Sequence, residues 1–425
     1  MTVLTPEISN MKTVVFIETN FSGLDAIRYC NEAGYRSVLV TDSVERFRKW
    51  FPASVLYKLD LADAIVSVDD SNDFEQVRAA IEKQIGQIDA LLTFAEIRTA
   101  VTAKLCAHLG LRGADPEAIA IAQDKHRFRQ VLQERGADSV KAVRIETVEE
   151  LRLLGESMTF PCFLKPVQGH SSIGAISCAS KSDIESVVAR LSTISEDWIS
   201  TAFVVEEFLS GDLVSVEMLT TSAGEHQLVG VSDRDVVHGS VEIGASFPLL
   251  NEHLHEIQSK ACSALDAIGY NFGPSHIEII VTADGPHLVE VNTRVGGSGH
   301  SIMLDLASGR SIVGDCIELC LGSLVPLRPL YEAHQGAAWK CLVSELEGVI
   351  ASLPSVESIK QSFPSVREVW LHHEVGDSID GTHSNYSWIL QVMCVGRDQQ
   401  EAKSNAAQVI DFASQRTFIK QQEMA

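Results

Sequence analysis

Two glutamates and an asparagine, Glu278, Glu290 and Asn292, interrupt the stretch HIEIIVTADGPHLVEVN, whose other residues favour apolar β-strands. Two apolar runs flank Ala-Asp-Gly at 283–285, which predicts a hairpin with a three-residue loop. Counting outward from that loop, Glu278 lies opposite Glu290. Because side chains alternate between faces, all three polar side chains share one face. Two carboxylates about 5 Å apart at Cβ destabilise a sheet unless a cation neutralises them.

Oxygen ligands from two carboxylates and one amide suit Mg²⁺, which shares its coordination shell with water and phosphate oxygens. Arg294 lies two residues after Asn292, so its side chain is expected on the same face, and its planar guanidinium suits a phosphate. The stretch therefore predicts a metal site that carries phosphate. The alternative is a salt-bridged or solvent-exposed hairpin without a ligand.

Lys165 ends an apolar strand and directly precedes a loop of small residues, Gln-Gly-His-Ser-Ser-Ile-Gly at 168–174. Backbone N–H groups and serine hydroxyls in such a loop can surround phosphate oxygens. The pattern differs from a P-loop because the lysine precedes the loop and no helix clearly follows. Lys125, in QDKHRFR, is a second candidate cation for a nucleotide. An ordinary turn and a solvated lysine remain the alternatives.

Glu206 and Glu207 end another apolar strand, and Asp212 follows a glycine turn in FVVEEFLSGDLVSVE. These acids are candidates for hydrogen bonds to an adenine amine or to ribose hydroxyls.

The first hundred residues must position part of this chemistry, and they alternate strand and helix signals. Strands are expected at 12–18, 36–42 and 88–94, and a helix at 22–34 ends at a glycine. This alternation predicts a parallel sheet. It also suggests a dinucleotide site, but the first turn holds only one glycine, Gly23, where that fingerprint needs three.

The rest of the chain has a different character. The segment DPEAIAIAQDKHRFRQVLQERG is expected to be strongly helical, and short strands divided by glycine turns predict an antiparallel sheet after about residue 200. The last hundred residues mix strand candidates with a terminal helix from about Asp398.

Composition restricts the partners and the compartment. A chain of 425 residues favours two to four domains. Its net charge of −23 argues against nucleic-acid and anionic-membrane partners. We expect neither a signal peptide nor a membrane span, since no suitable apolar run occurs. The nine cysteines are scattered without a CxxC pair, which favours a cytoplasmic protein.

In this order, the motifs DKHRFR, FLKPVQGHSSIG, VEEFLSGDLVSVE, HIEIIV and LVEVNTRVGG resemble those of the ATP-grasp superfamily of carboxylate–amine ligases. The resemblance covers about residues 115–310. Within the superfamily, the chain is similar to the L-amino acid ligases that make dipeptides.

The resemblance implies an α/β protein with the ATP-grasp fold. The expected parts are an N-terminal Rossmann-like domain at 1–114, an ATP-grasp domain at 115–325 with a lid subdomain at about 125–205, and a C-terminal α+β domain at 326–425. A homodimer is expected by the same analogy. The expected cofactors are ATP and Mg²⁺, with Mn²⁺ as a substitute.

The resemblance also assigns roles to individual residues. Lys125 and Lys165 would bind the ATP phosphates, and Arg294 would contact the transferring phosphoryl group, so that Arg294 and Lys165 are the expected catalytic residues. Glu278, Glu290 and Asn292 would hold Mg²⁺. The residues of the flexible cover over the phosphates would be Gly169, His170, Ser171, Ser172, Ile173 and Gly174.

The adenine would contact Glu206 and the backbone near Glu207 and Phe208. Asp212 would bind the ribose, although this position is often glutamate in relatives and the shorter aspartate weakens the assignment.

Substrate residues are expected in SDRDVVHGSVEIGASFP, where similar ligases line their pocket. Glu242 is a candidate for an ammonium group, and Arg234 or His238 for a carboxylate. Ordinary loop charges are the alternative for all three. The backbone of the glycine-rich corner would bind a carboxylate or an acyl phosphate through Gly297, Ser298, Gly299 and His300.

The expected reaction begins with attack of a carboxylate on the γ-phosphorus of ATP, giving an acyl phosphate and ADP. An amino acid amine then attacks the acyl carbon and displaces phosphate. Alternatives are an ATP-grasp enzyme acting on bicarbonate or a purine intermediate, a NAD-dependent oxidoreductase, and a non-catalytic nucleotide-binding protein.

Overall fold

The computed structural model describes residues 11–155, 158–194, 199–221, 224–323 and 332–421. The predicted domain boundary between residues 325 and 326 lies outside these residues, as does the start of the chain, where no signal peptide is expected. No helix among the described residues has the length and apolar character needed to cross a membrane.

A parallel four-stranded sheet in the order β3-β2-β1-β4 forms from the N-terminal βα repeats, as the alternating signals predict. Helix α1 begins after Asn20, whose side chain accepts a hydrogen bond from the backbone of Gly23, and it ends at the left-handed Gly34. The elements of this part are β1 (Thr13–Ile17), α1 (Phe21–Ala33), β2 (Arg36–Thr41), α2 (Val44–Trp50), α3 (Ala53–Leu56), η2 (Leu59–Leu61), β3 (Ala64–Ser67), α4 (Phe74–Ala80), the π-helix η3 (Ile81–Ile85), β4 (Ala90–Leu92), η4 (Glu96–Arg98) and α5 (Thr99–Leu109).

The segment predicted to be helical after residue 115 is helical and divides into two helices. Asp124 is extended, and its carboxylate accepts hydrogen bonds from the backbones of His126 and Arg127, which starts a new helix at Lys125. The helices are α6 (Pro116–Gln123) and α7 (Lys125–Glu134).

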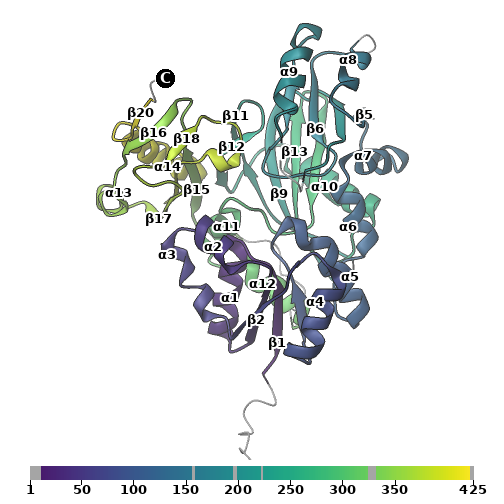
Figure 1. Cartoon of the computed structure of the whole chain (residues 1–425), viewed down its shortest axis with the longest axis vertical. Coiled ribbons are helices and arrows are strands. Elements are labelled where there is room, and N and C mark those ends of the chain that lie inside the picture. Colours follow the sequence, from purple (N-terminus) through teal and green to yellow (C-terminus); the bar gives the residue numbers. More distant parts are fainter. Residues whose placement is uncertain (1–10, 156–157, 195–198, 222–223, 324–331, 422–425) are drawn as a thin grey trace, which may run out of the picture.

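An antiparallel sheet in the order β10-β9-β13-β14 lies at the centre of the molecule, and its buried face packs against α6, α7 and α10. A smaller antiparallel sheet, in the order β5-β8-β6-β7, carries α8 and α9 and extends away from it (Figure 1). Their remaining elements are β5 (Ala142–Ile145), α8 (Glu150–Leu154), β6 (Cys162–Pro166), β7 (Ile176–Cys178), η5 (Lys181–Asp183), α9 (Ile184–Leu191), β8 (Phe203–Glu207), β9 (Gly211–Thr220), β10 (His226–Asp233), α10 (Leu254–Ile268), β13 (Gly273–Thr282) and β14 (Gly285–Asn292).

The C-terminal strands form a five-stranded sheet in the order β11-β12-β15-β19-β17 and a small sheet in the order β18-β16-β20. Most of the predicted substrate segment forms β11 and β12, which pair with each other, and β12 pairs with β15 across the predicted domain boundary. The elements are β11 (Asp235–Val237), β12 (Val241–Phe247), α11 (His300–Ser308), α12 (Ile312–Leu321), β15 (Gly336–Leu342), β16 (Glu347–Ser352), α13 (Val356–Ser362), β17 (Val366–Leu371), β18 (Ser378–Asp380), η6 (Asn385–Ser387), β19 (Leu390–Gly396), α14 (Gln399–Ser414) and β20 (Phe418–Lys420).

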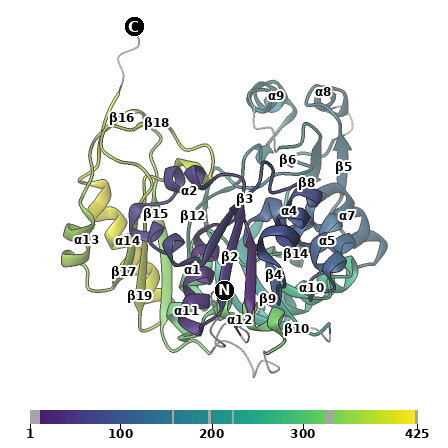
Figure 2. The same ribbon diagram turned by 60° about the horizontal axis from the view of Figure 1, so that its bottom comes forward.

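The three parts of the chain meet beside the central sheet. Helix α12 packs against α1 and β4 of the N-terminal part, and the Ser22 and Ser301 hydroxyls are 2.9 Å apart. Figure 2 shows the N-terminal sheet in front of the central strands, with the C-terminal sheet beside it. This meeting point contains most of the residues that the sequence singles out.

Candidate active site

The hairpin β13–β14 places Glu278 directly opposite Glu290, as predicted. The predicted loop is wrong, however, because Thr282 pairs with Gly285 around a two-residue turn. A β-bulge between the pairs of Glu278 and Ile279 inserts Val289 as an unpaired residue on β14. The extra residue compensates for the shorter loop and restores the facing carboxylates.

Glu278 is held as a carboxylate by two cationic neighbours. Its Oε1 lies 3.3 Å from Arg234 Nη1 and 3.6 Å from His276 Nε2. Burial raises the pKa of Glu278, but the charges of Arg234 and His276 outweigh burial and hold this pKa well below its usual range. His276 is itself buried and contacts the carboxylate of Glu217, as expected for a core histidine.

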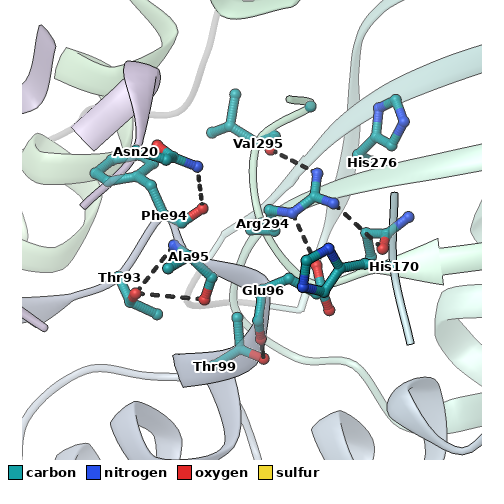
Figure 3. Close-up of polar contacts among 12 residues, drawn as sticks. Asn20, Thr93, Phe94, Ala95, Glu96, Thr99, His170, His276, Arg294 and Val295 are labelled. Atoms are coloured by element: carbon teal, nitrogen blue, oxygen red, sulfur yellow. Dashed lines mark hydrogen bonds and ion pairs between the residues drawn. The ribbon is translucent and has the colours of Figure 1, made fainter. Parts of the chain in front are cut away.

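Glu290 and Asn292 continue the same face. Asn292 Nδ2 donates to Glu290 Oε1 at 2.9 Å, and Lys125 Nζ lies 3.4 Å from Glu290 Oε2. Arg294 Nη2 reaches Asn292 Oδ1 at 3.4 Å, while Arg294 Nε lies 2.8 Å from a carboxylate oxygen of Glu96 (Figure 3). The structure therefore brings Lys125, Glu290, Asn292 and Arg294 together.

Two carboxylates and one amide on this face fit Mg²⁺, which accepts oxygen ligands and keeps positions for water and phosphate. The depressed pKa of Glu278 fits as well, because a metal ligand must be deprotonated. Within the described residues, no group of three or more His, Cys, Asp or Glu side chains forms a metal site by itself. Asn292 and the phosphates would have to complete the ligand set.

Lys165 lies in a buried network with Glu206 and Arg129. Lys165 Nζ is 3.0 Å from Glu206 Oε2 and donates to the carbonyl of the bulged Val289 at 3.1 Å. Arg129 binds both oxygens of Glu206, at 2.8 and 2.9 Å, and donates to the carbonyls of Leu288 and Val289. The network fixes the Lys165 ammonium behind the acidic hairpin.

This network changes the expected role of Glu206. Arg129 and Lys165 engage both carboxylate oxygens, so the side chain positions Lys165, and any contact with adenine falls to the backbone. Glu207 is exposed and accepts a hydrogen bond from the backbone of Lys141, while Phe208 is 40% exposed. Asp212 is exposed at the start of β9, opposite Val281.

The loop at 168–174 lies over the same face. Lys125 Nζ donates to the Gly169 carbonyl at 2.9 Å, and the charges of Arg294 and Lys125, after burial, lower the pKa of His170 to about 4. Ser171 and Ser172 both adopt left-handed backbone conformations, which cost about 1–2 kcal/mol each.

Two contacts hold these strained serines against the C-terminal sheet. Ser172 Oγ donates to the Ser240 carbonyl at 2.7 Å, and Asn385 N donates to the Ser171 carbonyl at 3.3 Å. Asn385 Oδ1 also accepts from the backbone of Glu242 at 3.0 Å. One residue thus connects the loop to the strand that carries the predicted substrate carboxylate.

The predicted substrate residues do not all come together. Arg234 Nη2 pairs with Glu242 Oε1, and Arg234 Nη1 donates to Ser215 Oγ at 2.5 Å. The Arg234 side chain is only 1% exposed, so it lies beneath Glu242. His238 lies apart at the surface, 3.0 Å from Glu345.

The glycine-rich corner leads into α11. Ser298 and Gly299 have φ values of 57° and 91°, and Gln391 Nε2 donates to the Ser298 carbonyl at 2.7 Å. A side chain at Gly297 would meet open space. His300 is buried, and both its backbone N and its Nδ1 contact the Gly297 carbonyl, so its backbone donor is engaged.

Sequence reasoning missed four residues of this region: Glu96, Arg129, Asn385 and Gln391. A signal for Glu96 was present, since it lies two residues after a predicted strand of a parallel sheet, where ligand-binding residues tend to lie. No comparable signal marks Arg129, Asn385 or Gln391, whose partners are distant in sequence.

Comparison with known proteins identifies the central region. Residues 158–302 match the family model of the ATP-grasp domain. The alanine–anticapsin ligase of Bacillus subtilis is 28% identical over 231 residues, which are 49% of each chain. The chain spans about half the length of the curated relatives it matches.

Solved structures share the fold over almost the whole chain. The L-amino acid ligase from Bacillus licheniformis has a TM-score of 0.78 at 19% identity, covering 97% of this chain and 99% of that one. The biotin carboxylase domain dimer of the Hydrogenobacter thermophilus 2-oxoglutarate carboxylase, solved with MgADP and bicarbonate, has a TM-score of 0.70 at 17% identity, covering 96% and 90%. The predicted ATP-grasp fold is confirmed.

Proposed function

Because the chain contains an ATP-grasp domain within an ATP-grasp fold, we propose that it is an ADP-forming carbon–nitrogen ligase. It joins the carboxylate of an amino acid or another small carboxylic acid to the amine of an amino acid. One observation carries the proposal: Glu278 and Glu290 face each other on a sheet surface that also holds Asn292, and Lys125 and Arg294 contact this surface from the side. The likeness to the alanine–anticapsin ligase and the L-amino acid ligase supports this substrate class.

The reaction starts at a carboxylate, which is unreactive toward amines. Its oxygen attacks the γ-phosphorus of ATP, and ADP leaves as the acyl phosphate forms. The neutral amine then attacks the acyl carbon, phosphate leaves, and the amine loses a proton. Lys125 and Lys165 hold the phosphates, and Arg294 contacts the transferring group, which is chiefly positioning and electrostatic stabilisation.

Glu278, Glu290 and Asn292 are the residues that would hold Mg²⁺, and Mn²⁺ is proposed to substitute. The bound ion would supply positive charge to the phosphoryl oxygens. The loop at 168–174, held by Ser240 and Asn385, excludes water that would otherwise hydrolyse the acyl phosphate.

Glu242 is proposed to bind an ammonium group of a substrate, with Arg234 beneath it fixing the carboxylate. The same pairing leaves Arg234 less suited to bind a substrate carboxylate directly. Backbone N–H groups of the corner at 297–299 are proposed for that carboxylate or for the acyl phosphate.

A second candidate keeps the phosphorylation step and uses bicarbonate as the acid. The fold likeness to a carboxylase domain solved with bicarbonate supports this alternative. The NAD-dependent alternative has no comparable support, because the matched domain is an ATP-grasp domain.

The test is phosphate release from ATP and Mg²⁺ across pairs of the twenty amino acids and common small carboxylic acids, with and without bicarbonate. Mass spectrometry identifies the product of each positive pair, and chromatography separates ADP from AMP. We expect ADP, phosphate and a condensed product with one class of pairs. Bicarbonate-dependent release without amide formation would support the second candidate, and AMP formation would contradict both.

A homodimer in the cytoplasm is proposed by analogy with similar enzymes, one of which is a domain dimer. Light scattering after gel filtration measures the mass, and a 46.3 kDa particle would exclude the dimer.

A further inference from the structure

The carboxylate of Glu96 lies where the proposed function brings phosphate groups, which repel carboxylates. Burial raises the pKa of Glu96, the charge of Glu290 adds to this effect, and Arg294 and Lys125 oppose it. A carboxylate in such a place is costly unless it has a specific cationic partner. Its presence therefore calls for a role in the site.

The partner is Arg294, which follows the acidic hairpin in a different part of the chain. The Glu96 oxygen and Arg294 Nε are 2.8 Å apart, and the two side chains are only 17% and 14% exposed. Arg294 also donates to the Val295 carbonyl at 3.0 Å and to Asn292 Oδ1 at 3.4 Å. Val295 and Asn292 thus accept hydrogen bonds from the two terminal nitrogens of the guanidinium, while Glu96 pairs with it as an ion at Nε. A guanidinium has five N–H groups, so others can bind an incoming oxygen.

The backbone around Glu96 is fixed by hydrogen bonds (Figure 3). Asn20 Nδ2 donates to the Phe94 carbonyl at 2.6 Å, and Thr93 Oγ1 accepts from Ala95 N at 3.1 Å. The Glu96 carbonyl accepts from Thr99 Oγ1 at 3.0 Å and from Gln123 Nε2 at 3.2 Å. Because its backbone is already fixed, Glu96 loses less conformational entropy when its side chain pairs with Arg294.

We propose that Glu96 is a positioning residue that holds the Arg294 guanidinium toward the transferring phosphoryl group before ATP binds. A free arginine side chain would have to be ordered during the reaction, whereas a preorganised one stabilises the transition state without that cost. The inference rests on the proposed function, which gives Arg294 its phosphoryl contact.

A double-mutant cycle tests this role with Glu96→Ala, Arg294→Ala and both together. We expect each single change to lower kcat about tenfold or more with KM for ATP within about twofold, and the pair to be no worse than Arg294→Ala. Glu96→Gln keeps one acceptor oxygen for Arg294 Nε and should recover part of kcat. Glu82→Ala, which removes an exposed partner of Arg78 in the same part of the chain, is the matched control.

A binding measurement gives a second readout that needs no substrate pair. ADP, Mg²⁺ and aluminium fluoride together imitate a transferring phosphoryl group, and titration calorimetry compares their binding with that of ADP and Mg²⁺ alone. We expect Glu96→Ala and Arg294→Ala each to weaken binding of the fluoride complex and to leave binding of ADP and Mg²⁺ alone unchanged. The double variant should bind the fluoride complex no more weakly than Arg294→Ala does. Glu96→Leu, whose side chain has no acceptor oxygen, serves the same titration if Glu96→Ala does not fold.

Three results would overturn the inference: full kcat in Glu96→Ala, unchanged binding of the fluoride complex, or a raised KM for the amine that persists in the Arg294→Ala background. The last result would make Glu96 an ammonium ligand. If the wild type makes no product with any pair, the proposed function fails, and the fluoride titration still decides whether Glu96 acts through Arg294.

Discussion

Replacing Glu206 by glutamine should destabilise the protein by about 3 kcal/mol at pH 7. Burial raises the pKa of Glu206, but the charges of Arg129 and Lys165 outweigh burial and lower this pKa from 4.5 to about 2. Since a tenfold change in proton affinity is about 1.4 kcal/mol, the ionised carboxylate stabilises the fold by about 3 kcal/mol. The glutamine variant would leave Arg129 and Lys165 buried beside each other without an anion, a loss of about 3–5 kcal/mol in comparable sites.

The pH dependence follows from the direction of the shift. Because the pKa of Glu206 is lower in the folded state, its stabilisation is complete above pH 4.5 and is lost as the pH falls toward 2. The difference between wild type and Glu206→Gln should therefore be full at pH 7 and smaller at pH 3.

Urea unfolding followed by circular dichroism measures the global effect, and amide hydrogen exchange in β6, β8 and α7 measures the local one. Glu185→Gln is the matched control, because Glu185 is an exposed partner of Arg152 on the same subdomain and its loss should leave stability unchanged. Adding Arg129→Leu to Glu206→Gln should recover part of the loss, because it removes one of the unpaired cations. A loss below about 1 kcal/mol in Glu206→Gln, or one that grows at pH 3, would refute the reasoning.

Three further changes test the site. Glu290→Gln should lower Mg²⁺-dependent phosphate release about 100-fold or more, because it removes one of the two proposed carboxylate ligands; Glu185→Gln is the exposed control, and full turnover would remove Glu290 from the proposed metal site. Lys165→Met should weaken ATP binding about tenfold in titration calorimetry, since the buried cation that is proposed to bind the phosphates is lost; Lys141→Met is the control, and equal affinity would contradict the assignment. Asn385→Ala should raise the ratio of phosphate released to product formed about threefold or more, because it removes the side-chain hydrogen bond to the Glu242 backbone that holds Asn385, whose own backbone N–H binds the loop at 168–174; a ratio equal to that of the wild type would show that this hydrogen bond does not protect the intermediate.

The hairpin shows how far the sequence alone leads. Alternating apolar residues predict the two strands and the facing glutamates. They also predict a loop that is one residue too long, and they do not predict the bulge at Val289. The carbonyl of Val289 is bound by Lys165 and Arg129, which come from β6 and α7. A bulge stabilised by distant side chains leaves no mark in the local pattern.

The sequence also does not reveal which side chains contact each other in the folded protein. The sequence correctly predicts Glu206 near the end of a strand. Nothing in the neighbouring residues indicates that Arg129, 77 residues away, binds both of its carboxylate oxygens. The sequence predicts Arg234 and Glu242 as separate substrate ligands and does not reveal that the two side chains pair with each other. The terminal helix from Asp398 was confirmed, because an N-cap is a local signal.

Contacts that cross between parts of the chain also affect how such a gene can recombine. Glu96 and Arg294 lie on opposite sides of the expected junction near residue 115, and their contact joins two side chains. A chimaera that exchanged the N-terminal part with a relative would inherit one member of this pair without the other. Functional crossovers should therefore be those that transfer both partners, and Glu96 and Arg294 are positions where related sequences are expected to change together.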